Sequence, residues 1–165
     1  MTEAGGRFAL HVAKESFKFA AAHFITYRGF REALHGHNYA VGVTVEGGLG
    51  STGYVLDFGL VKQIAKRICE ELDERVLIPT RSETLTVTER AGAVELDCED
   101  GSRFVLPRAD VVLLPVAHSS AEELARYLCE RLTRELGASA AATLTAVEIS
   151  VAEAPGQAAA YRMRL

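Results

Sequence analysis

Residues 35–46 read HGHNYAVGVTVE, and the argument for the fold starts from this stretch. From His37 to Glu46 its side chains alternate between apolar and polar or small. Successive side chains of a strand point to opposite faces, so the alternation predicts a strand with one buried face. That face consists of Tyr39, Val41, Val43 and Val45. The glycine-rich stretch GGLGSTG at 47–53 predicts a turn or loop after the strand.

Further strand patterns lie on both sides of this one. Apolar or alternating runs precede it at 7–13 and 15–25, and others follow at 83–89, 93–98, 102–106, about 143–153 and 158–164. Ala91-Gly92 and Asp100-Gly101 separate the middle three, and Asp-Gly is a strong hairpin signal. These runs predict a chain rich in antiparallel strands.

Two stretches have helical periodicity instead. Asp57 is a suitable N-cap, and apolar residues then recur at helical spacing as far as Leu72, which predicts a helix over about 57–72. A second helix is expected after the capping pattern Ser-Ser-Ala-Glu at 119–122, ending at Gly137. Segregated strands and helices predict an α+β fold, with one domain over residues 1–165 and two helices backing an antiparallel sheet.

The composition excludes several classes of protein. The chain has 165 residues, 48% of them hydrophobic, and a formal net charge of −4 without a basic block. This argues against a nucleic-acid surface. No apolar run approaches the roughly 20 residues of a membrane helix, and the N-terminus does not resemble a signal peptide. We therefore expect a cytoplasmic protein with no membrane or nucleic-acid partner.

The three cysteines, Cys69, Cys98 and Cys129, do not form a disulfide framework. Their number is odd and none has CxxC spacing. Cys69 and Cys129 fall in helical patterns, where small core residues are the expected interpretation.

Histidines supply the strongest chemical signal. His35 and His37 are two positions apart at the start of a strand, so they share a face, and Gly36 between them leaves room for an ion. His23, at the end of the preceding apolar run, can add a third ligand if the two strands pair. Three protein ligands leave one position open, as in catalytic zinc sites. Iron, nickel or copper stay open as alternatives, as do ordinary surface or hydrogen-bonded histidines.

Several motifs resemble the 6-pyruvoyl-tetrahydropterin synthase family, which includes the 6-carboxy-tetrahydropterin synthases of queuosine biosynthesis. The matching segments are Phe19–His23, Leu34–Tyr39, Gly53–Phe58, Leu72-Asp73, Ser120–Ala125 and Val151–Glu153. The resemblance implies a T-fold that assembles through its sheet edges into a homohexamer. It also implies zinc on the three histidines and a pterin held by Glu153, and we expect Ser120 to contribute to substrate binding.

Glu153 has the right chemistry for that role. A pterin presents an exocyclic amine and a ring N–H side by side, and one carboxylate can accept both. The alternative is an ordinary exposed charge at a strand end.

The chain departs from the family at the catalytic cysteine. Typical members carry it a few residues before the first histidine of HGH, whereas here no cysteine precedes Cys69. Glu32 stands three residues before His35, as in a branch of the family with Glu-x-x-His-Gly-His. Members of that branch act as aldolase-like lyases on 7,8-dihydroneopterin triphosphate and release 6-hydroxymethyl-7,8-dihydropterin for folate synthesis. The resemblance makes Glu32 the candidate catalytic base; the alternative is a solvated loop charge.

A second departure follows Leu72-Asp73. Family members usually continue with a histidine that relays protons with this aspartate, but this chain has Glu74. Asp73 therefore remains a catalytic candidate without its usual partner, and His118 is a candidate replacement. An apparent insertion at about 80–117, which we expect to form an extra hairpin, could cover the pocket or elaborate the edge of the assembly.

The leading hypothesis from sequence is thus a zinc-dependent pterin lyase acting on 7,8-dihydroneopterin triphosphate or a close relative. The alternatives are synthesis of 6-pyruvoyl- or 6-carboxy-tetrahydropterin, and a non-catalytic pterin-binding homologue. Basic residues near the mouth would suit a triphosphate; Lys14, Lys18, Arg28 and Arg31 are available, but the sequence does not place them.

Overall fold

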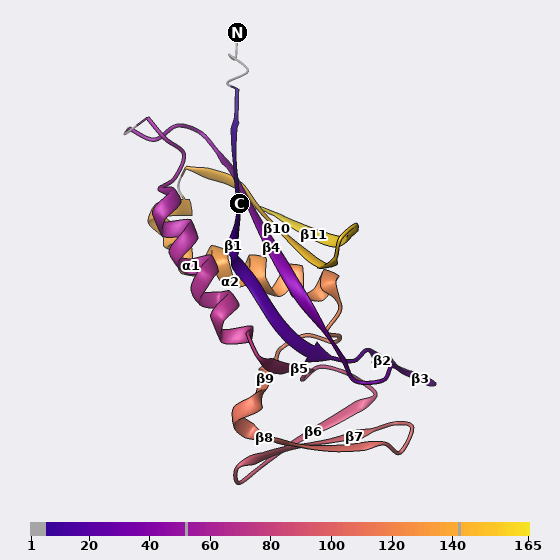
Figure 1. Ribbon diagram of the computed structural model, residues 1–165. Coiled ribbons are helices and arrows are strands. Elements are labelled where there is room, and N and C mark those ends of the chain that lie inside the picture. Colours follow the sequence, from indigo (N-terminus) through magenta and orange to yellow (C-terminus); the bar gives the residue numbers. More distant parts are fainter. Residues whose placement is uncertain (1–5, 52, 142) are drawn as a thin grey trace.

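A long mixed sheet forms the body of the molecule in the computed structural model, which describes residues 6–51, 53–141 and 143–165. Within these residues the sheet has six strands in the order β11-β10-β4-β1-β5-β9 (Figure 1). The strands are β1 (Phe8–His23), β4 (His35–Gly47), β5 (Arg75–Pro79), β9 (Val111–Leu114), β10 (Leu144–Ala154) and β11 (Gln157–Arg164). Residues 1–5 and Thr52 lie outside the described part of the chain. Thr52 falls in the predicted turn at 47–53.

The predicted antiparallel sheet is confirmed for the four long strands, from β11 to β1. Two short strands, β5 and β9, extend it in parallel beyond β1, and the sequence pattern did not predict them. Each has only four or five residues, which leaves too little alternation to recognise.

The two runs predicted at 7–13 and 15–25 form one strand, β1, with an irregular register between Ala13 and Lys18. Val12 is buried before the irregularity, whereas Phe17, Phe19 and His23 are buried after it. The buried positions thus change from even to odd numbers. A shift of one residue exchanges the two faces of a strand, so the irregularity keeps apolar side chains on the core side along all of β1.

Both predicted helices are present, and both cover the same face of the sheet (Figure 1). Helix α1 (Phe58–Leu72) begins at Asp57, whose Oδ1 accepts a hydrogen bond of 2.7 Å from the Gly59 amide, as predicted. Helix α2 (Ala121–Ala141) is interrupted at Gly137, where φ is 75°. The predicted end at Gly137 is therefore a kink, and the helix resumes beyond it.

The main core lies between the helices and the sheet. Its fully buried side chains include Tyr39, Phe19, Leu72, Leu124, Leu132 and Ile149. All three cysteines are free and buried, and Cys69 and Cys129 belong to this core, which confirms their predicted role. Burial of this apolar surface is the main force that holds the helices against the sheet.

The insertion forms a second, three-stranded antiparallel sheet of β6 (Leu85–Arg90), β7 (Ala93–Cys98) and β8 (Arg103–Pro107). It lies beyond the lower end of the main sheet (Figure 1). The short helix η1 (Arg108–Asp110) then leads into β9. A separate apolar cluster, which includes Phe24, Ile78, Leu85, Val94, Leu96, Cys98 and Val111, holds the insertion in place. The predicted extra hairpin is thus confirmed, with one strand more than a single hairpin.

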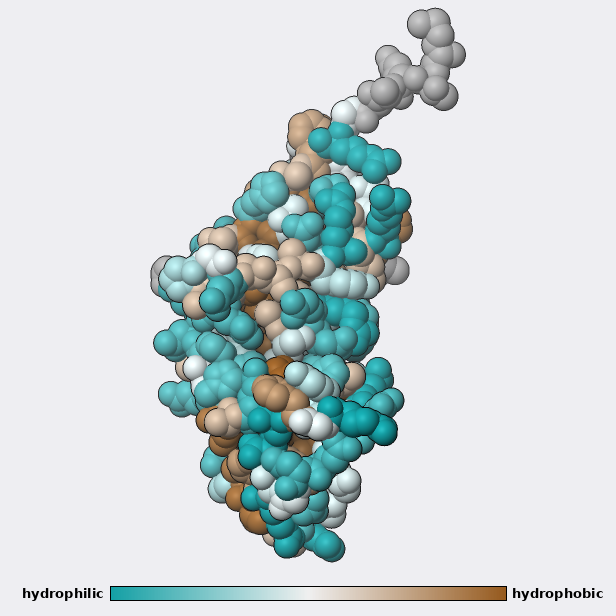
Figure 2. All heavy atoms as spheres, turned by 90° about the vertical axis from the view of Figure 1, so that its right-hand side faces the viewer, coloured by the Kyte–Doolittle hydropathy of each residue, from teal (hydrophilic) through white to brown (hydrophobic). Residues whose placement is uncertain are grey.

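None of the described helices is long and apolar enough to cross a membrane. The face shown in Figure 2 is mostly hydrophilic, with scattered hydrophobic patches.

Candidate metal centre and cavity

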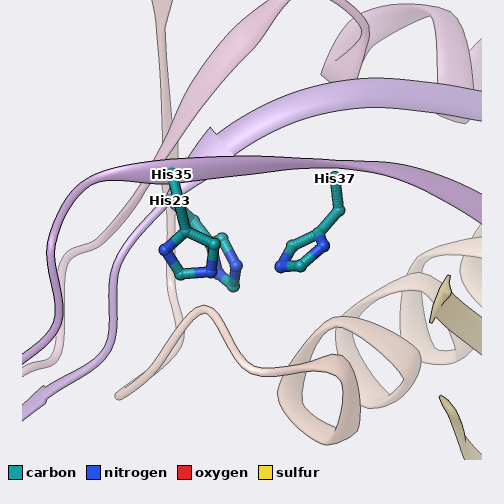
Figure 3. Close-up of side chains that lie close together, drawn as sticks. All are labelled: His23, His35 and His37. Atoms are coloured by element: carbon teal, nitrogen blue, oxygen red, sulfur yellow. The ribbon is translucent and has the colours of Figure 1, made fainter.

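Three histidines converge where β1 ends and β4 begins. His23 is the cross-strand partner of His35, and His37 pairs with Ala21 two positions along. The ring centroids lie 4.7 Å (His23–His35), 5.2 Å (His23–His37) and 4.9 Å (His35–His37) apart. One nitrogen from each ring lies within 4.8 Å of the others. Figure 3 shows all three rings on the same side of the strands. The structure therefore brings together the three residues that the sequence singled out as ligands.

Hydrogen bonds to backbone carbonyls orient two of these rings. His23 Nδ1 lies 2.8 Å from the Ser119 oxygen, and His35 Nδ1 lies 2.9 Å from the Ala33 oxygen. A carbonyl oxygen only accepts, so both Nδ1 atoms carry a proton, and in the neutral ring this leaves the lone pair on Nε2. A second partner that fixes the tautomer in this way is typical of metal-bound histidine.

The surroundings of His23 Nε2 indicate that a metal ion would fit between the three rings. His23 is only 2% exposed, and its Nε2 has no hydrogen-bond partner among the described residues. Buried polar atoms without a partner are rare and destabilising. A cation held by the three Nε2 lone pairs would supply the missing partner, and a set of neutral imidazoles suits zinc.

Burial also sets the charge of His23. It lowers the pKa of the ring below its usual range because desolvation disfavours the imidazolium form. The Ser119 carbonyl opposes this shift, and the neighbouring His35 reinforces it. His23 is consequently neutral near pH 7, which is the form that binds a metal.

A cavity of about 330 Å³ lies directly against the three rings. Four segments contribute to its wall. They are Glu32, directly after β3 (Phe30–Arg31), the start of α2, the end of β10 and the start of β11. The described residues that line it are His23, Ile25, Glu32, His35, His37, Ser120, Ala121, Glu122, Glu153, Gln157, Ala158 and Ala159. Three of them are glutamates, and no lysine or arginine is among them.

Glu32 is held at the cavity by two bonds to a single residue. Its backbone amide donates to the Ile25 oxygen at 2.9 Å, and the Ile25 amide donates to Glu32 Oε2 at 3.0 Å. This pair of bonds closes the loop that connects β1 to β4 and fixes the carboxylate relative to that loop. One donor on one oxygen leaves acceptor capacity for a ligand.

Glu153 and Ser120 also reach the cavity, from the end of β10 and the start of α2. The negative charge of Glu153 acts on His23 and raises its pKa slightly against the effect of burial. Ser120 Oγ accepts from the Glu123 amide at 3.4 Å, so it caps α2. The cap lies one residue later than the pattern at 119–122 suggested, because Ser119 Oγ instead donates to the Phe24 oxygen at 3.2 Å.

Asp73 and His118 do not line this cavity. Asp73 follows α1, and its Oδ1 accepts from the Ala20 amide at 2.7 Å. The next residue, Glu74, has a positive φ of 56° and donates its amide to the Ala20 oxygen. His118 is half-buried just before Ser119, and its Nδ1 has no hydrogen-bond partner in the described part of the chain. The aspartate thus ties α1 to β1 within this chain.

Sequence reasoning missed Glu122 and Gln157 as cavity residues. Glu122 lies in a segment that carries the family resemblance, but an acidic residue in the first turn of a helix is equally expected from the helix dipole. Gln157 lies between the predicted strands at about 143–153 and 158–164, and only the pairing of β11 with β10 brings it to the cavity.

Comparison with known proteins agrees with this fold and site. The model of the 6-pyruvoyl tetrahydropterin synthase family matches residues 11–164. The chain therefore belongs to the 6-pyruvoyl tetrahydropterin synthase family, whose members are lyases. The 6-pyruvoyl tetrahydropterin synthase of Plasmodium falciparum superposes with a TM-score of 0.93 at 37% identity, covering 98% of this chain and 100% of that one. The expected T-fold is thereby confirmed.

Relatives within the family carry different activities in their names. A Methanocaldococcus jannaschii protein, provisionally named a 6-carboxy-5,6,7,8-tetrahydropterin synthase, is 32% identical over 90% of this chain and 91% of its own length. A Pyrococcus furiosus dihydroneopterin monophosphate aldolase is 41% identical over 36% of this chain and 50% of its own. Two solved structures are variants of the Plasmodium vivax 6-pyruvoyltetrahydropterin synthase in which a catalytic glutamate is replaced by alanine or by cysteine. Each superposes with a TM-score of 0.92 at 33% identity, and the match covers 98% of this chain and 100% of that one.

Proposed function

We propose that this protein is a zinc-dependent lyase that cleaves the side chain of a phosphorylated 7,8-dihydroneopterin and releases 6-hydroxymethyl-7,8-dihydropterin. One observation carries the proposal: the Glu32 carboxylate lies in the same cavity as the three histidines. No described cysteine lines that cavity. The catalytic glutamate of the Plasmodium vivax enzyme and the aldolase activity named for the Pyrococcus furiosus relative support this assignment.

Glu153 would hold the pterin ring in the same cavity. Its carboxylate can accept from the exocyclic amine and the adjacent ring N–H, and such paired bonds to a charged acceptor fix a planar ligand in one orientation. Ser120 and Glu122, at the start of α2, would contact the ligand between Glu153 and the histidines.

The reaction balances as a retro-aldol cleavage. The hydroxyl on the second side-chain carbon loses its proton to a base, its oxygen becomes a carbonyl, and the bond between the first and second side-chain carbons breaks. The electron pair of that bond moves onto the first carbon and is delocalised into the pterin C6–N5 imine. A proton returned to the first carbon completes 6-hydroxymethyl-7,8-dihydropterin, and the other product is the phosphorylated glycolaldehyde. Glu32 would accept this proton and return it.

A zinc ion bound by His23, His35 and His37 would polarise the side-chain hydroxyls as a Lewis acid and make them easier to deprotonate. The histidines would bind the ion through their Nε2 atoms. Burial of His23 keeps water away from one side of the site, which strengthens electrostatic interactions there.

A second candidate function is the synthesis of 6-carboxy- or 6-pyruvoyl-tetrahydropterin. The match to the Methanocaldococcus jannaschii protein over nine-tenths of the chain favours the 6-carboxy product. Family membership supports two further proposals: a homohexamer joined through the sheet edges, and a cytoplasmic location, with a role in folate or queuosine synthesis according to the product.

The test is product analysis with the zinc-loaded protein. Dihydroneopterin triphosphate, the monophosphate and dephosphorylated dihydroneopterin are incubated separately, and products are separated by chromatography with fluorescence detection. We expect 6-hydroxymethyl-7,8-dihydropterin and an equal amount of the two-carbon aldehyde from at least one substrate. A 6-carboxy or 6-pyruvoyl product would support the second candidate. Unchanged substrate in all three reactions, with retained pterin binding, would instead identify a non-catalytic pterin-binding protein.

A further inference from the structure

The loop that carries Glu32 leaves the main sheet and contacts the inserted sheet. We call residues 24–32 the Glu32 loop; it contains the short strands β2 (Thr26–Tyr27) and β3 (Phe30–Arg31), which pair with each other. Figure 1 shows this pair projecting beside the insertion at the lower end of the molecule. Most of the loop thus contacts a different part of the chain from the one that holds the metal ligands, although its first residue, Phe24, also accepts from Ser119 Oγ.

Arg31 makes the principal connection. Its Nε lies 2.7 Å from Asp100 Oδ2, and its Nη2 donates to Ser102 Oγ at 3.0 Å. Both partners belong to the turn between β7 and β8. The remaining arm, Nη1, donates to the Glu32 backbone oxygen at 2.8 Å. One planar guanidinium therefore joins the inserted sheet directly to the residue assigned as the base.

Apolar and backbone contacts support the same connection. The rings of Phe24 and Phe104 stack with centroids 5.2 Å apart, and the Arg31 guanidinium lies 5.6 Å from the Phe104 centroid. The Gly29 amide donates to Glu99 Oε2 at 3.0 Å, and the hydroxyls of Thr26 and Thr84 are 3.1 Å apart. The Glu32 loop is therefore fastened to the insertion at both ends and at its tip.

A catalytic group must be placed precisely in order to act. A displacement of about 1 Å can cost on the order of 100-fold in rate. The bond from the Ile25 amide to Glu32 is internal to the loop, so it fixes the carboxylate relative to the loop only. Ser119 Oγ fixes the start of the loop through the Phe24 oxygen, and contacts to the insertion fix the rest of it, including its end at Arg31.

We propose that Asp100 is a positioning residue, which holds Arg31 and through it places Glu32 against the metal site, and that this is the role of the inserted sheet. The inference rests on the proposed function, because it assigns Glu32 as the base. The hydrogen bond from Arg31 also lowers the pKa of the Asp100 carboxyl, so the pair stays charged at neutral pH.

The substitution Asp100→Asn tests this role most directly, because it removes the charge and keeps the size of the side chain. Asp100 Oδ1 accepts from the Ser102 amide at 2.9 Å, and an asparagine oxygen can keep this bond and the turn. Its amide NH₂ would face the Arg31 donor and break the ion pair. The matched control is Asp97→Asn, on the same strand hairpin, where Asp97 pairs with Arg103 at 3.5 Å and does not contact the Glu32 loop in any described interaction.

Two measurements decide the inference. We expect Asp100→Asn to lower kcat about tenfold with little change in KM or zinc content, since the ground-state contacts to the pterin are untouched. We also expect faster amide hydrogen exchange over residues 25–32 in this variant, and wild-type behaviour in both measurements for Asp97→Asn. In an Arg31→Ala background, Asp100→Asn should cause no further loss, because both changes break the same connection.

Wild-type kcat and wild-type exchange in Asp100→Asn would overturn the inference. So would equal losses in Asp100→Asn and Asp97→Asn, which would indicate general destabilisation of the insertion. Failure of the proposed function has a different signature. In that case the wild-type protein does not cleave dihydroneopterin phosphates, while the exchange measurement still reports whether Asp100 fixes the loop.

Discussion

His23 donates its Nδ1 proton to the backbone oxygen of Ser119 over 2.8 Å, although 96 positions separate the two residues in the sequence. The bond joins the end of β1 to the segment that leads into α2. It fixes the ring so that Nε2 faces His35 and His37. The geometry of the candidate metal centre therefore depends on a contact that only the complete fold provides.

Replacing His23 should remove the metal. His23→Ala deletes one of three ligands, and we expect the zinc content after dialysis to fall from about one per chain to near zero, with loss of lyase activity. Zinc is measured by elemental analysis. The control is His11→Ala, an exposed histidine on the same strand that contacts Thr44. Retention of stoichiometric zinc by His23→Ala would refute the assignment of the metal centre.

Replacing Glu32 by glutamine should separate chemistry from binding. The glutamine oxygen can still accept from the Ile25 amide, so the loop keeps its shape, but the side chain no longer takes up a proton at neutral pH. We expect kcat to fall about 10²–10⁴-fold, the range for loss of a general base. Zinc content and pterin affinity should stay within about twofold. An undiminished kcat would exclude Glu32 as the base; Glu83→Gln, at an exposed position outside the cavity, is the control.

Glu153 should determine pterin affinity. Glu153→Gln turns a charged double acceptor into a group with one acceptor and one donor, so one of the two pterin donors faces an N–H. Losing a charge-assisted bond costs about 1.5–3 kcal/mol, so we expect the pterin Kd to rise roughly tenfold to a hundredfold. Fluorescence titration of the zinc-loaded protein measures it. Glu148→Gln, on the same strand but near Arg162, should leave Kd unchanged; equal Kd values for wild type and Glu153→Gln would contradict the role.

The cysteines should be unreactive in the native protein. Burial raises the pKa of Cys69 to about 12 and that of Cys129 to about 11, and it raises the pKa of Cys98 as well. A raised pKa lowers the thiolate fraction, and the thiolate is the reactive form. We expect a thiol reagent at pH 8 to label none of the three in the folded state and all of them in guanidinium chloride. Iodoacetamide should leave lyase activity intact, whereas inactivation at the rate of labelling would indicate a thiol in the chemistry.

Sequence patterns predicted the long elements of this fold well. β4, α1 and the hairpins of the insertion each have a clear period or turn signal, and the structure has them within a few residues of the predicted bounds. The joining of 7–13 and 15–25 into one strand was not predictable from alternation, because the irregularity after Ala13 reverses the alternation itself. β5 and β9 were missed because both are too short to show an alternation, and β9 reaches the main sheet only after the insertion.

The sequence likewise predicted some residues of the candidate site and not others. His23, His35 and His37 could be grouped from sequence because strand spacing alone relates two of them and one pairing adds the third. Glu32, Ser120 and Glu153 line the same cavity as expected from the family resemblance. Gln157 and the Ser119 carbonyl carry no signal of their own in the sequence. Asp73 and His118 lie outside the cavity. The sequence could not predict this because their positions follow from the packing of α1 and α2, which periodicity does not specify.

The neighbouring residues His23 and Phe24 face different cores. His23 belongs to the candidate metal centre on the main sheet, and Phe24 is buried in the apolar cluster of the insertion. Proteins often open in separate cooperative units before they unfold completely. If the smaller core opens first, as mild denaturant or heat would favour, the Glu32 loop is released while β1 and β4 still hold the three histidines together. The chain would then lose the placement of Glu32 before it lost the cluster of three histidines.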